Sequence, residues 1–399
     1  MQENRTPVRR PRHTAKIKGA LAHNPVCALL GPRQCGKTTL ARQVVRGRAD
    51  AHVFDLETAL GQAQLAEPEL TLGSLRGLVV IDEIQRAPKL FEVLRPLADR
   101  RGTPARFLIL GSASPDLVRG VSESLAGRIE FVDLGGFDLT EVGSRNWRKL
   151  WVRGGFPRSY LARSDVLSVR WRRDFVRTFL ERDVPQLGIR IPATTLRRFW
   201  MMLAHYHAQI WNGAEFARSF GVNEHTVRRY IEVLSGAYLV RQLPPWFENI
   251  SKRQYKAPKV YIRDSGLLHA LLGVDSWGEL AAHPKLGASW EGFALEQVLT
   301  LANGADAYFW GTHAGAELDL LLLHKGRRFG VEFKYAAAPV MTKSLHVALA
   351  DLKLQQAWIV HPGSQRYAVH PKVEVVPLVE LPDRLAFMER PAKVRKAGV

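Results

Sequence analysis

The chain has 399 residues, of which 46% are hydrophobic and 24% are charged. This composition is close to the average of globular proteins, so disorder along the whole chain is excluded, and the length predicts roughly two to four domains. Lysine and arginine outnumber aspartate and glutamate by 57 to 38, and the formal net charge of +19 favours a polyanionic partner, nucleic acid before an anionic membrane.

The cysteine count and the N-terminal residues bear on the compartment. Cys27 and Cys35 are the two cysteines of the chain, too few for a disulfide framework or a cysteine metal cage. No stretch approaches the roughly 18 apolar residues of a membrane span, and residues 1–20 lack the apolar segment of a secretory signal. We therefore expect a cytoplasmic protein without a membrane partner.

Residues 20–144 are predicted to form an α/β domain, preceded by a flexible basic arm at residues 1–19. Helical stretches such as 37–46 and 89–99 alternate with short apolar runs. These runs predict strands at 26–30, 52–56, 78–81, 107–110 and 129–134. Because apolar runs alternate with helices in this way, we expect a parallel sheet with both faces covered by helices.

A phosphate-binding loop follows the first predicted strand. Residues 31–38 match the pattern G-x-x-x-x-G-K-[ST] in full. Glycines let successive backbone N–H groups point at phosphate oxygens, the lysine adds a positive charge and the hydroxyl serves Mg²⁺. The pattern predicts an ATP site formed by Gly31, Pro32, Arg33, Gln34, Cys35, Gly36, Lys37, Thr38 and Thr39.

The other expected residues of this site follow later strands. The run at 78–81 ends in Asp82 and Glu83, so we expect Asp82 to hold Mg²⁺ together with Thr38, and Glu83 to polarise the attacking water. Ser112 either contacts the γ-phosphate or caps a helix. Arg128 is either a solvated surface residue or an arginine finger for a neighbouring chain, which would require a homo-oligomer.

The middle of the chain is predicted to be helical and basic. Residues 145–200 form a predicted helical lid or linker with fourteen Lys or Arg against four Asp or Glu. Residues 201–262 form a predicted winged-helix-like domain, in which helices at 214–220 and 224–234 are joined by a turn and the second is capped by Asn223. Its exposed face would carry Thr226, Arg228 and Arg229, and both DNA contact and a purely structural use remain open.

These motifs, with others along the chain, resemble those of a known family. They include GPRQCGKTTLA at 31–41, VVIDEIQRAPKLFEVLR at 79–95, FLILGSAS at 107–114, SLAGR at 124–128, GGFP at 154–157, FLERDV at 179–184, YIRDSGLL at 261–268 and WEGFALE at 290–296. The chain resembles prokaryotic AAA-type ATPases that carry a C-terminal domain of uncharacterised function. The resemblance implies a P-loop NTPase sheet of order 5-1-4-3-2, a helical and winged-helix-like middle, and a restriction-endonuclease-like α/β domain at the C-terminus.

The predicted C-terminal domain, residues 263–385, contains a second candidate site before a basic tail at 386–399. Glu291 begins a predicted helix, and Asp319 begins the predicted strand that precedes the motif E-x-K. In that motif, alternation along its own strand places both charged residues on one face. Two or three carboxylates can hold Mg²⁺ while a lysine orients water for phosphodiester hydrolysis. The candidate residues are Glu291, Asp319, Glu332 and Lys334, with Glu317 as an alternative acid.

Three hypotheses of function follow. The first is an AAA-type ATPase that binds and hydrolyses ATP with Mg²⁺ and is coupled to nucleic-acid binding, with DNA favoured over RNA. The second adds an ATP-regulated, Mg²⁺-dependent nuclease at the C-terminal acids. The third is a non-enzymatic switch, in which ATP binding gates contact with a protein partner.

Overall fold

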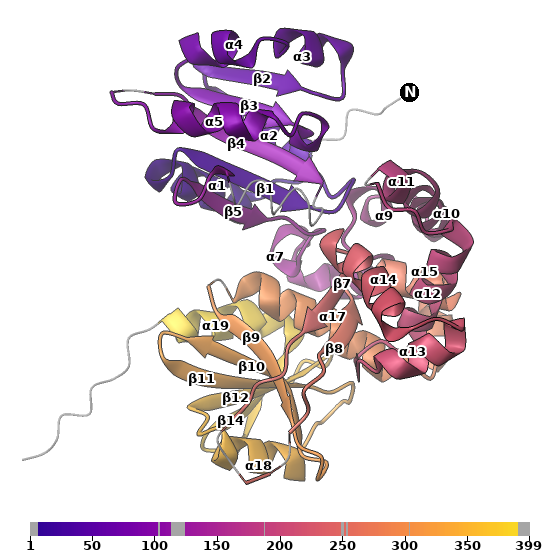
Figure 1. The fold of residues 1–399 in the computed structure, drawn as a ribbon. Helices are drawn as coiled ribbons and strands as arrows, with labels where there is room; N and C mark the ends of the chain where they lie inside the picture. The colour runs from indigo at the N-terminus through magenta and orange to yellow at the C-terminus, as the bar shows by residue number, and fades with distance from the viewer. Residues whose placement is uncertain are drawn as a thin grey trace, which may run out of the picture.

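The computed structural model describes residues 7–102, 104–112, 124–186, 188–248, 251–252, 254–302 and 304–389. Figure 1 shows an N-terminal sheet at the top, a group of helices at the right and a C-terminal sheet at the bottom. Helices α7 (Leu139–Val142) and α17 (Leu286–Leu301) lie between the two sheets (Figure 1). The chain therefore folds into three parts that meet around these two helices.

The N-terminal part is a five-stranded parallel sheet in the order β2-β3-β4-β1-β5. This is the predicted order 5-1-4-3-2 read from the other edge, so the prediction is confirmed. Its elements are α1 (Pro11–His23), β1 (Val26–Gly31), α2 (Lys37–Val45), β2 (Ala51–Asp55), α3 (Ala59–Gln64), α4 (Pro68–Ser74), β3 (Leu78–Asp82), η1 (Ile84–Arg86), α5 (Leu90–Ala98), β4 (Arg106–Ser112) and β5 (Ile129–Asp133).

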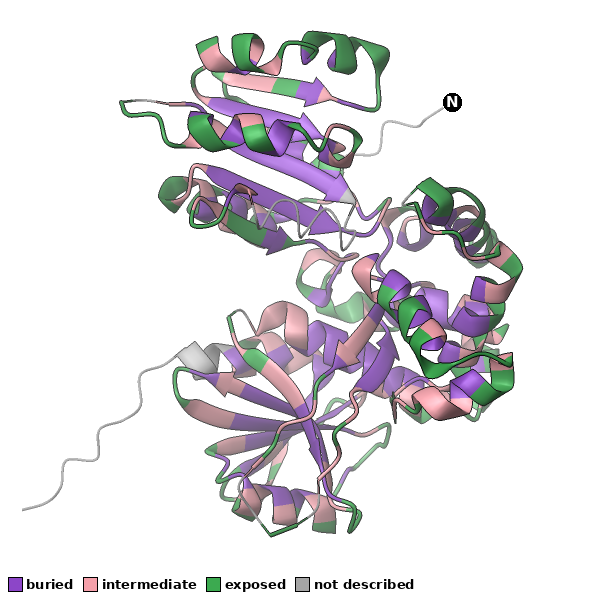
Figure 2. Cartoon of the chain, viewed as in Figure 1, coloured by how far each residue is buried: buried purple, intermediate pink, exposed green. Residues whose placement is uncertain are grey.

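The central strands of this sheet are buried, as their apolar runs predict. Every residue of β1 and β3 is buried, whereas the edge strands β2 and β5 are only partly so. Figure 2 shows the same contrast between the central strands and β2. Alternate side chains enter two separate cores: Cys27 and Leu29 lie in one, and Val26 and Ala28 in the other. Because both faces are covered, these strands read as continuous apolar runs.

The expected basic arm is wrong for the residues that the structure describes. Residues 11–23 form α1, which buries Ile17 and Ala20 in the core beside β1. Just before the helix, the Arg10 guanidinium is 3% exposed and its Nε donates to Glu141 Oε1 at 2.7 Å. The reason for the error is that the basic residues alternate with an apolar stripe, which a charge count overlooks. Residues 1–6 lie outside the described part of the chain.

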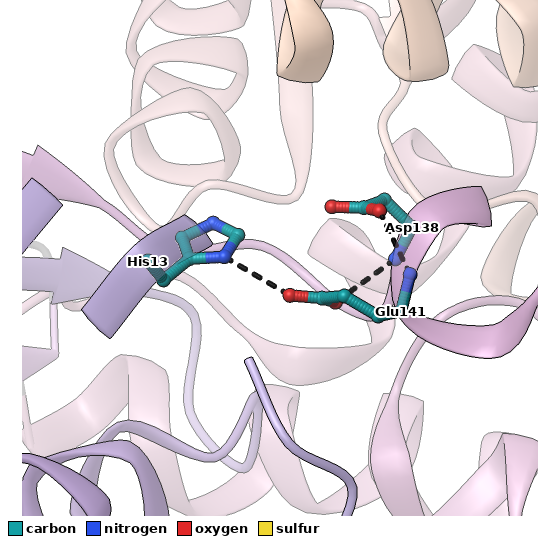
Figure 3. A group of neighbouring side chains, drawn as sticks. All are labelled: His13, Asp138 and Glu141. Atoms are coloured by element: carbon teal, nitrogen blue, oxygen red, sulfur yellow. Dashed lines mark hydrogen bonds and ion pairs between the residues drawn. The ribbon is translucent and has the colours of Figure 1, made fainter. Parts of the chain in front are cut away.

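Glu141 is the centre of this attachment of α1. His13 Nδ1 lies 3.0 Å from Glu141 Oε1, and Figure 3 shows the two side chains pointing toward one another with Asp138 beside them. Asp138 and Glu141 also form a capping box at the start of α7. Burial alone would raise the pKa of Glu141, but His13 and Arg10 hold that pKa below its usual value.

The helical part follows the first sheet. Its elements are α7, η2 (Ser144–Asn146), α8 (Trp147–Arg153), α9 (Pro157–Tyr160), α10 (Asp165–Thr178), the π-helix η3 (Phe179–Asp183), α11 (Val184–Gln186), α12 (Ala193–His205), α13 (Gly213–Phe220), α14 (Glu224–Gly236), α15 (Ser265–Leu272) and α16 (Trp277–Ala282). Helical spacing brings Phe175 and Phe179 into a stack with centroids 6.4 Å apart. Asn223 caps α14 as predicted, because its side chain accepts from Thr226 N at 2.8 Å.

Two predicted domain limits fall inside packed structure. Helix α12 crosses the limit predicted between residues 200 and 201. Helix α15 begins after the limit predicted at residue 262, but its Leu267 and Leu268 belong to the same core as Phe199 of α12. A small antiparallel sheet, β6-β8-β7, completes this part with β6 (Gln209–Ile210), β7 (Val240–Leu243) and β8 (Lys259–Ile262).

The C-terminal part is a mixed six-stranded sheet in the order β13-β14-β12-β11-β10-β9. Its elements are α17, β9 (Asp306–Gly311), β10 (Glu317–His324), β11 (Arg327–Phe333), α18 (Lys343–Asp351), β12 (Gln356–His361), β13 (Tyr367–His370), β14 (Val373–Pro377), η4 (Leu378–Glu380) and α19 (Leu381–Glu389). Residues 386–389 of the expected tail therefore continue α19, and residues 390–399 lie outside the described part. Helix α17 contributes Trp290 and Phe293 to a core shared with Trp151 of α8.

The attachment of α1 predicts a large loss of stability in Glu141→Ala. Removing this carboxylate leaves the buried Arg10 without its charged partner, which costs about 3–5 kcal/mol for buried pairs. The matched control is Glu57→Ala, because Glu57 pairs with Arg86 at the surface at 3.4 Å, where such a pair contributes about 0–1 kcal/mol. Chemical denaturation of both variants provides the comparison, and equal losses would contradict the role given to Glu141.

Candidate functional site

The phosphate loop begins where β1 passes against the backbone after β5. A Cβ atom on Gly31 would lie 2.1 Å from the carbonyl oxygen of Leu134, so a side chain cannot be accommodated there without a shift. Gly36 has φ +99° and Gln34 has φ 63°, both left-handed. Cys35 faces inward and is fully buried. These constraints turn the loop tightly before α2 begins at Lys37.

Lys37 lies inside the loop that it follows. It is 6% exposed, and its Nζ donates to the carbonyl oxygens of Gly31 and Pro32 at 3.0 Å each. An ammonium group held within a cradle of backbone groups is the arrangement that a phosphate-binding loop requires. The residues present therefore fit a nucleotide phosphate.

The loop and the second strand motif meet as predicted. Thr38 Oγ1 donates to Asp82 Oδ2 at 2.7 Å, and the backbone N of Glu83 donates to Asp82 Oδ1 at 2.9 Å. Burial raises the pKa of Asp82, and the hydroxyl of Thr38 acts in the opposite direction. Thr38 and the following Thr39 are exposed. A hydroxyl and a carboxylate oxygen side by side match the ligands that Mg²⁺ prefers.

Glu83 leaves β3 in a strained conformation. Its φ of 56° is left-handed, which is uncommon for a residue with a side chain. The side chain is half-buried and accepts a hydrogen bond from Gln85 Nε2. Strain of this kind is found where the surrounding structure holds a residue in place for a task.

Arg33 connects the loop with the helical part, a contact that we did not predict. Its Nη1 donates to Asp183 Oδ1 at 2.5 Å and its Nη2 to Gln186 Oε1 at 2.9 Å. Burial raises the pKa of Asp183, although Arg33 and Arg182 lie beside it. Asp183 ends the π-helix η3, a rare element that often marks functional sites. The motif FLERDV at 179–184 singled out this segment in the sequence, but it could not indicate that Asp183 pairs with Arg33, 150 residues earlier.

Of the two other predicted residues of this site, Ser112 lies next to the phosphate loop and Arg128 lies away from it. Ser112 ends β4 beside Gly31, but its side chain lies outside the described residues. The phosphate loop follows the last residue of β1, whereas Arg128 lies beside the first: its carbonyl accepts a hydrogen bond from Val26 N at 3.1 Å. Its guanidinium pairs with Asp99 at 2.6 and 2.8 Å. Arg128 therefore cannot act on the nucleotide of its own chain, and a role toward a neighbouring chain stays a prediction.

In the C-terminal part, the predicted acids surround a lysine that we did not predict. Lys259 Nζ lies 3.2 Å from Glu291 Oε1 and 3.8 Å from Asp319 Oδ1, and it forms a close ion pair with Glu317. Tyr261, two residues later on β8, donates from its hydroxyl to Glu291 Oε1 at 2.8 Å. Lys259 is 4% exposed. Lys259 and Tyr261 alternate with the apolar residues of β8, and this pattern could have indicated that both polar side chains face the same neighbours.

The remaining members of that predicted set are adjacent to these acids. The register that pairs Leu320 with Val331 places Asp319 beside Glu332 on the neighbouring strand. Lys334 Nζ lies 3.0 Å from Glu332 Oε1. Burial, followed by the charge of Asp319, raises the pKa of Glu332 well above its usual value. The structure thus brings together all the acids that were predicted for a second site.

Another group of possible metal ligands is already neutralised. In this group, His13, Asp138 and Glu141 lie close enough together to share an ion (Figure 3). Arg10 and Arg12 pair with the two carboxylates at 2.7 and 2.9 Å. These guanidinium groups provide the compensating charge, so the group attaches α1 rather than forming a metal centre.

A cavity of about 680 Å³ lies between β5, β7 and α17. The charged groups on its wall pair with one another: Arg241 and Arg263 contact Glu296, and the Tyr238 hydroxyl donates to Asp133 Oδ1 at 2.7 Å. The cavity therefore presents these ion pairs at the junction of the three parts, and Pro32 of the phosphate loop also lines it.

The helix pair α13–α14 presents cations on its outer surface. Val227 and Tyr230 face the core, whereas Arg228 and Arg229 are exposed. Thr226 is only half-exposed, and its hydroxyl donates to the side chain of Asn223 that caps the helix. The two arginines, rather than Thr226, are therefore available to a partner.

Comparison with family models divides the chain as the structure does. An AAA domain matches residues 23–143. A domain of unknown function (DUF8612) matches residues 144–277, and a second one (DUF4143) matches residues 286–381. With the sheet order and the phosphate loop, these matches define the class: an AAA-type P-loop ATPase with a C-terminal domain of uncharacterised function. The resemblance found in the sequence is thereby confirmed.

Two curated mycobacterial proteins are similar along most of their length. They are "Uncharacterized protein Rv2008c" of Mycobacterium tuberculosis and "Uncharacterized protein Mb2031c" of Mycobacterium bovis. Each is 52% identical over 363 residues, which are 91% of this chain and 82% of the relative. The chain belongs to the same family as these two proteins.

Solved structures show a more distant likeness. The Walker-type ATPase PABY2304 of Pyrococcus abyssi has a TM-score of 0.47 at 15% identity, covering 68% of this chain and 99% of its own. The RuvB Holliday junction branch migration motor of Thermotoga maritima has a TM-score of 0.31 at 18% identity, covering 59% of this chain and 90% of its own. Likeness at this level says nothing about what this chain binds.

Two broader conclusions follow from the fold and the family. The AAA-type P-loop fold supports nucleotide binding and ATP hydrolysis. Among the helices of the described ranges, each is too short or too polar to cross a lipid bilayer.

The close approach of β1 to the backbone after β5 predicts the effect of Gly31→Ala. The added Cβ would collide with the Leu134 carbonyl, and overpacking of this kind costs about 1–3 kcal/mol or more. We expect lower stability together with loss of ATP binding, measured by thermal unfolding with and without nucleotide. Gly19→Ala is the matched control, because nothing lies within 4 Å of a Cβ there and alanine favours a helix by up to about 1 kcal/mol.

Proposed function

We propose that this protein binds and hydrolyses ATP with Mg²⁺ at the phosphate loop. The observation that carries the proposal is the 2.7 Å hydrogen bond between Thr38 and Asp82. It joins the start of α2, which begins at the buried Lys37, to the end of β3, so both candidate metal ligands lie at the phosphate loop. A turn without a catalytic role would not need this combination.

Each residue of the site then has a task. The backbone N–H groups of the loop and Lys37 bind the phosphates of ATP. Thr38 and Asp82 would hold Mg²⁺, which neutralises phosphate charge when bound. Glu83, which follows β3 with a left-handed φ of 56°, accepts a proton from the attacking water at its carboxylate.

The assignment of Glu83 predicts a separation of binding from turnover. Glu83→Gln keeps the shape of the side chain but cannot accept the proton, so we expect kcat to fall by about 10²–10⁴-fold with ATP affinity retained. Lys37→Ala should instead weaken ATP binding. Steady-state ATPase assays and nucleotide titration measure the two effects, with Glu92→Gln on the exposed side of α5 as the control.

The same measurements decide between this proposal and a non-enzymatic switch. A wild-type protein that binds ATP tightly, but whose basal turnover is unchanged in Glu83→Gln, would favour the switch. Turnover that depends on protein concentration and is lost in Arg128→Ala would instead support the arginine finger and a homo-oligomer.

A second candidate function is nucleic-acid binding through α14, with DNA favoured. The observation in its favour is the exposure of Arg228 and Arg229 on a helix whose opposite face is buried. The formal charge of +19 adds attraction for any polyanion. A helix that follows a short turn and presents its outer face can enter a major groove or track phosphates.

This candidate predicts a specific change in salt dependence. The double variant Arg228→Ala/Arg229→Ala should bind duplex DNA more weakly, and the slope of log affinity against log salt should fall by about 2, or about 1 for each lost phosphate contact. Arg76→Ala/Arg101→Ala removes the same charge from exposed positions of the ATPase part. If both double variants weaken binding equally, the attraction comes from net charge alone.

A further inference from the structure

The acids of the C-terminal part enclose a cation that comes from another part of the chain. Glu291 belongs to α17, whereas Glu317 and Asp319 belong to β10. The ammonium between them belongs to Lys259 on β8, a strand of the small sheet β6-β8-β7. The contact therefore joins the middle of the chain to the C-terminal sheet.

Lys259 is buried among the acids as a bound ion would be, and it does not form an ion pair at the surface. Its side chain is 5% exposed and lies against three carboxylates. The ammonium supplies positive charge that a buried group of carboxylates needs.

One ammonium does not balance the acids. Four carboxylates lie here with two ammonium groups, because Glu332 and Lys334 adjoin Asp319. Glu332 is 4% exposed, and its Oε2 has no hydrogen-bond partner within the described part of the chain. A buried carboxyl oxygen without a partner is costly, so Glu332 can accept a further donor or a cation at this atom.

We propose that these acids form a divalent-cation site that Lys259 holds closed. Carboxylate oxygens are the ligands of hard divalent cations, and such an ion would supply one more charge than the ammonium does. Lys259 and a metal ion would contact the same oxygens of Glu291, Glu317 and Asp319, so they exclude each other. In the position that β8 takes here, the C-terminal part binds no divalent cation at these acids.

The closure is reinforced along the same strand. Arg263 follows β8 and contacts Glu296 on α17, five residues after Glu291. The backbone N of Ile262 donates to the buried His207 Nδ1 at 2.9 Å. Withdrawal of Lys259 therefore requires β8 to give up several contacts, which makes the closure stable rather than incidental. Metal-dependent hydrolysis at Asp319 and Lys334 would need this withdrawal, and the inference does not depend on the ATPase proposal.

The test is Mn²⁺ binding by the full-length, nucleotide-free protein, measured by titration calorimetry. Lys259→Met keeps the length of the side chain and removes its charge, so we expect one Mn²⁺ to bind at least tenfold more tightly than in the wild type. The binding should disappear in Lys259→Met/Asp319→Asn. The matched control is Lys256→Met, an exposed lysine three residues earlier, which should behave as the wild type does.

Two further measurements keep the proposal open to contradiction. Lys259→Met that binds Mn²⁺ no better than the wild type would overturn it, and Lys259→Gln serves the same comparison if the methionine variant does not fold. A second comparison uses no lysine variant. If the wild type binds Mn²⁺ and Asp319→Asn does not, the acids accept a metal with Lys259 in place, and the proposed closure is overturned. A melting temperature that Mn²⁺ raises in Lys259→Met, but not in Lys256→Met, would support the closed site.

Discussion

The buried face of α17 depends on cations that the strand pair β7–β8 places against it. Glu291 meets Lys259, and Glu296 meets Arg241 and Arg263. Each of these charges is buried or half-buried, and the loss of one partner of a buried pair costs several kcal/mol, of the order of 3–5. The helical part and the C-terminal sheet therefore have to assemble in one register, because a shift of β8 would leave acids of α17 without partners.

Ion pairs between distant residues also attach the N-terminal sheet to the rest of the chain. Arg33 leaves the phosphate loop to reach Asp183 at the end of the π-helix, and Arg10 joins α1 to Glu141 at the start of α7. The first contact comes from a residue inside the nucleotide site. A change in the loop on binding ATP would therefore act directly on the helical part, where α12 packs against both the π-helix and β8.

The ATPase part was largely predictable because its signals are local. The apolar runs that became β1 and β3 are buried on both faces, and the loop from Gly31 to Thr38 is one contiguous motif. The basic N-terminal residues were misinterpreted because α1 carries its buried stripe among many cations. Strands β13 and β14 and helix α18 were not predicted, since elements of four to nine residues are too short to show a clear periodicity.

The amino-acid sequence by itself determined the class of nucleotide site and the identity of the acids in the C-terminal part, because residue type and spacing along the chain define both. The tertiary structure alone decided what those groups face. Lys259 lies 58 and 60 residues before the acids of β10 that it contacts, and Arg33 lies 150 residues before Asp183. An apolar neighbourhood indicates that a charged residue will be buried, but only the packed fold selects the opposite charge that makes its burial possible.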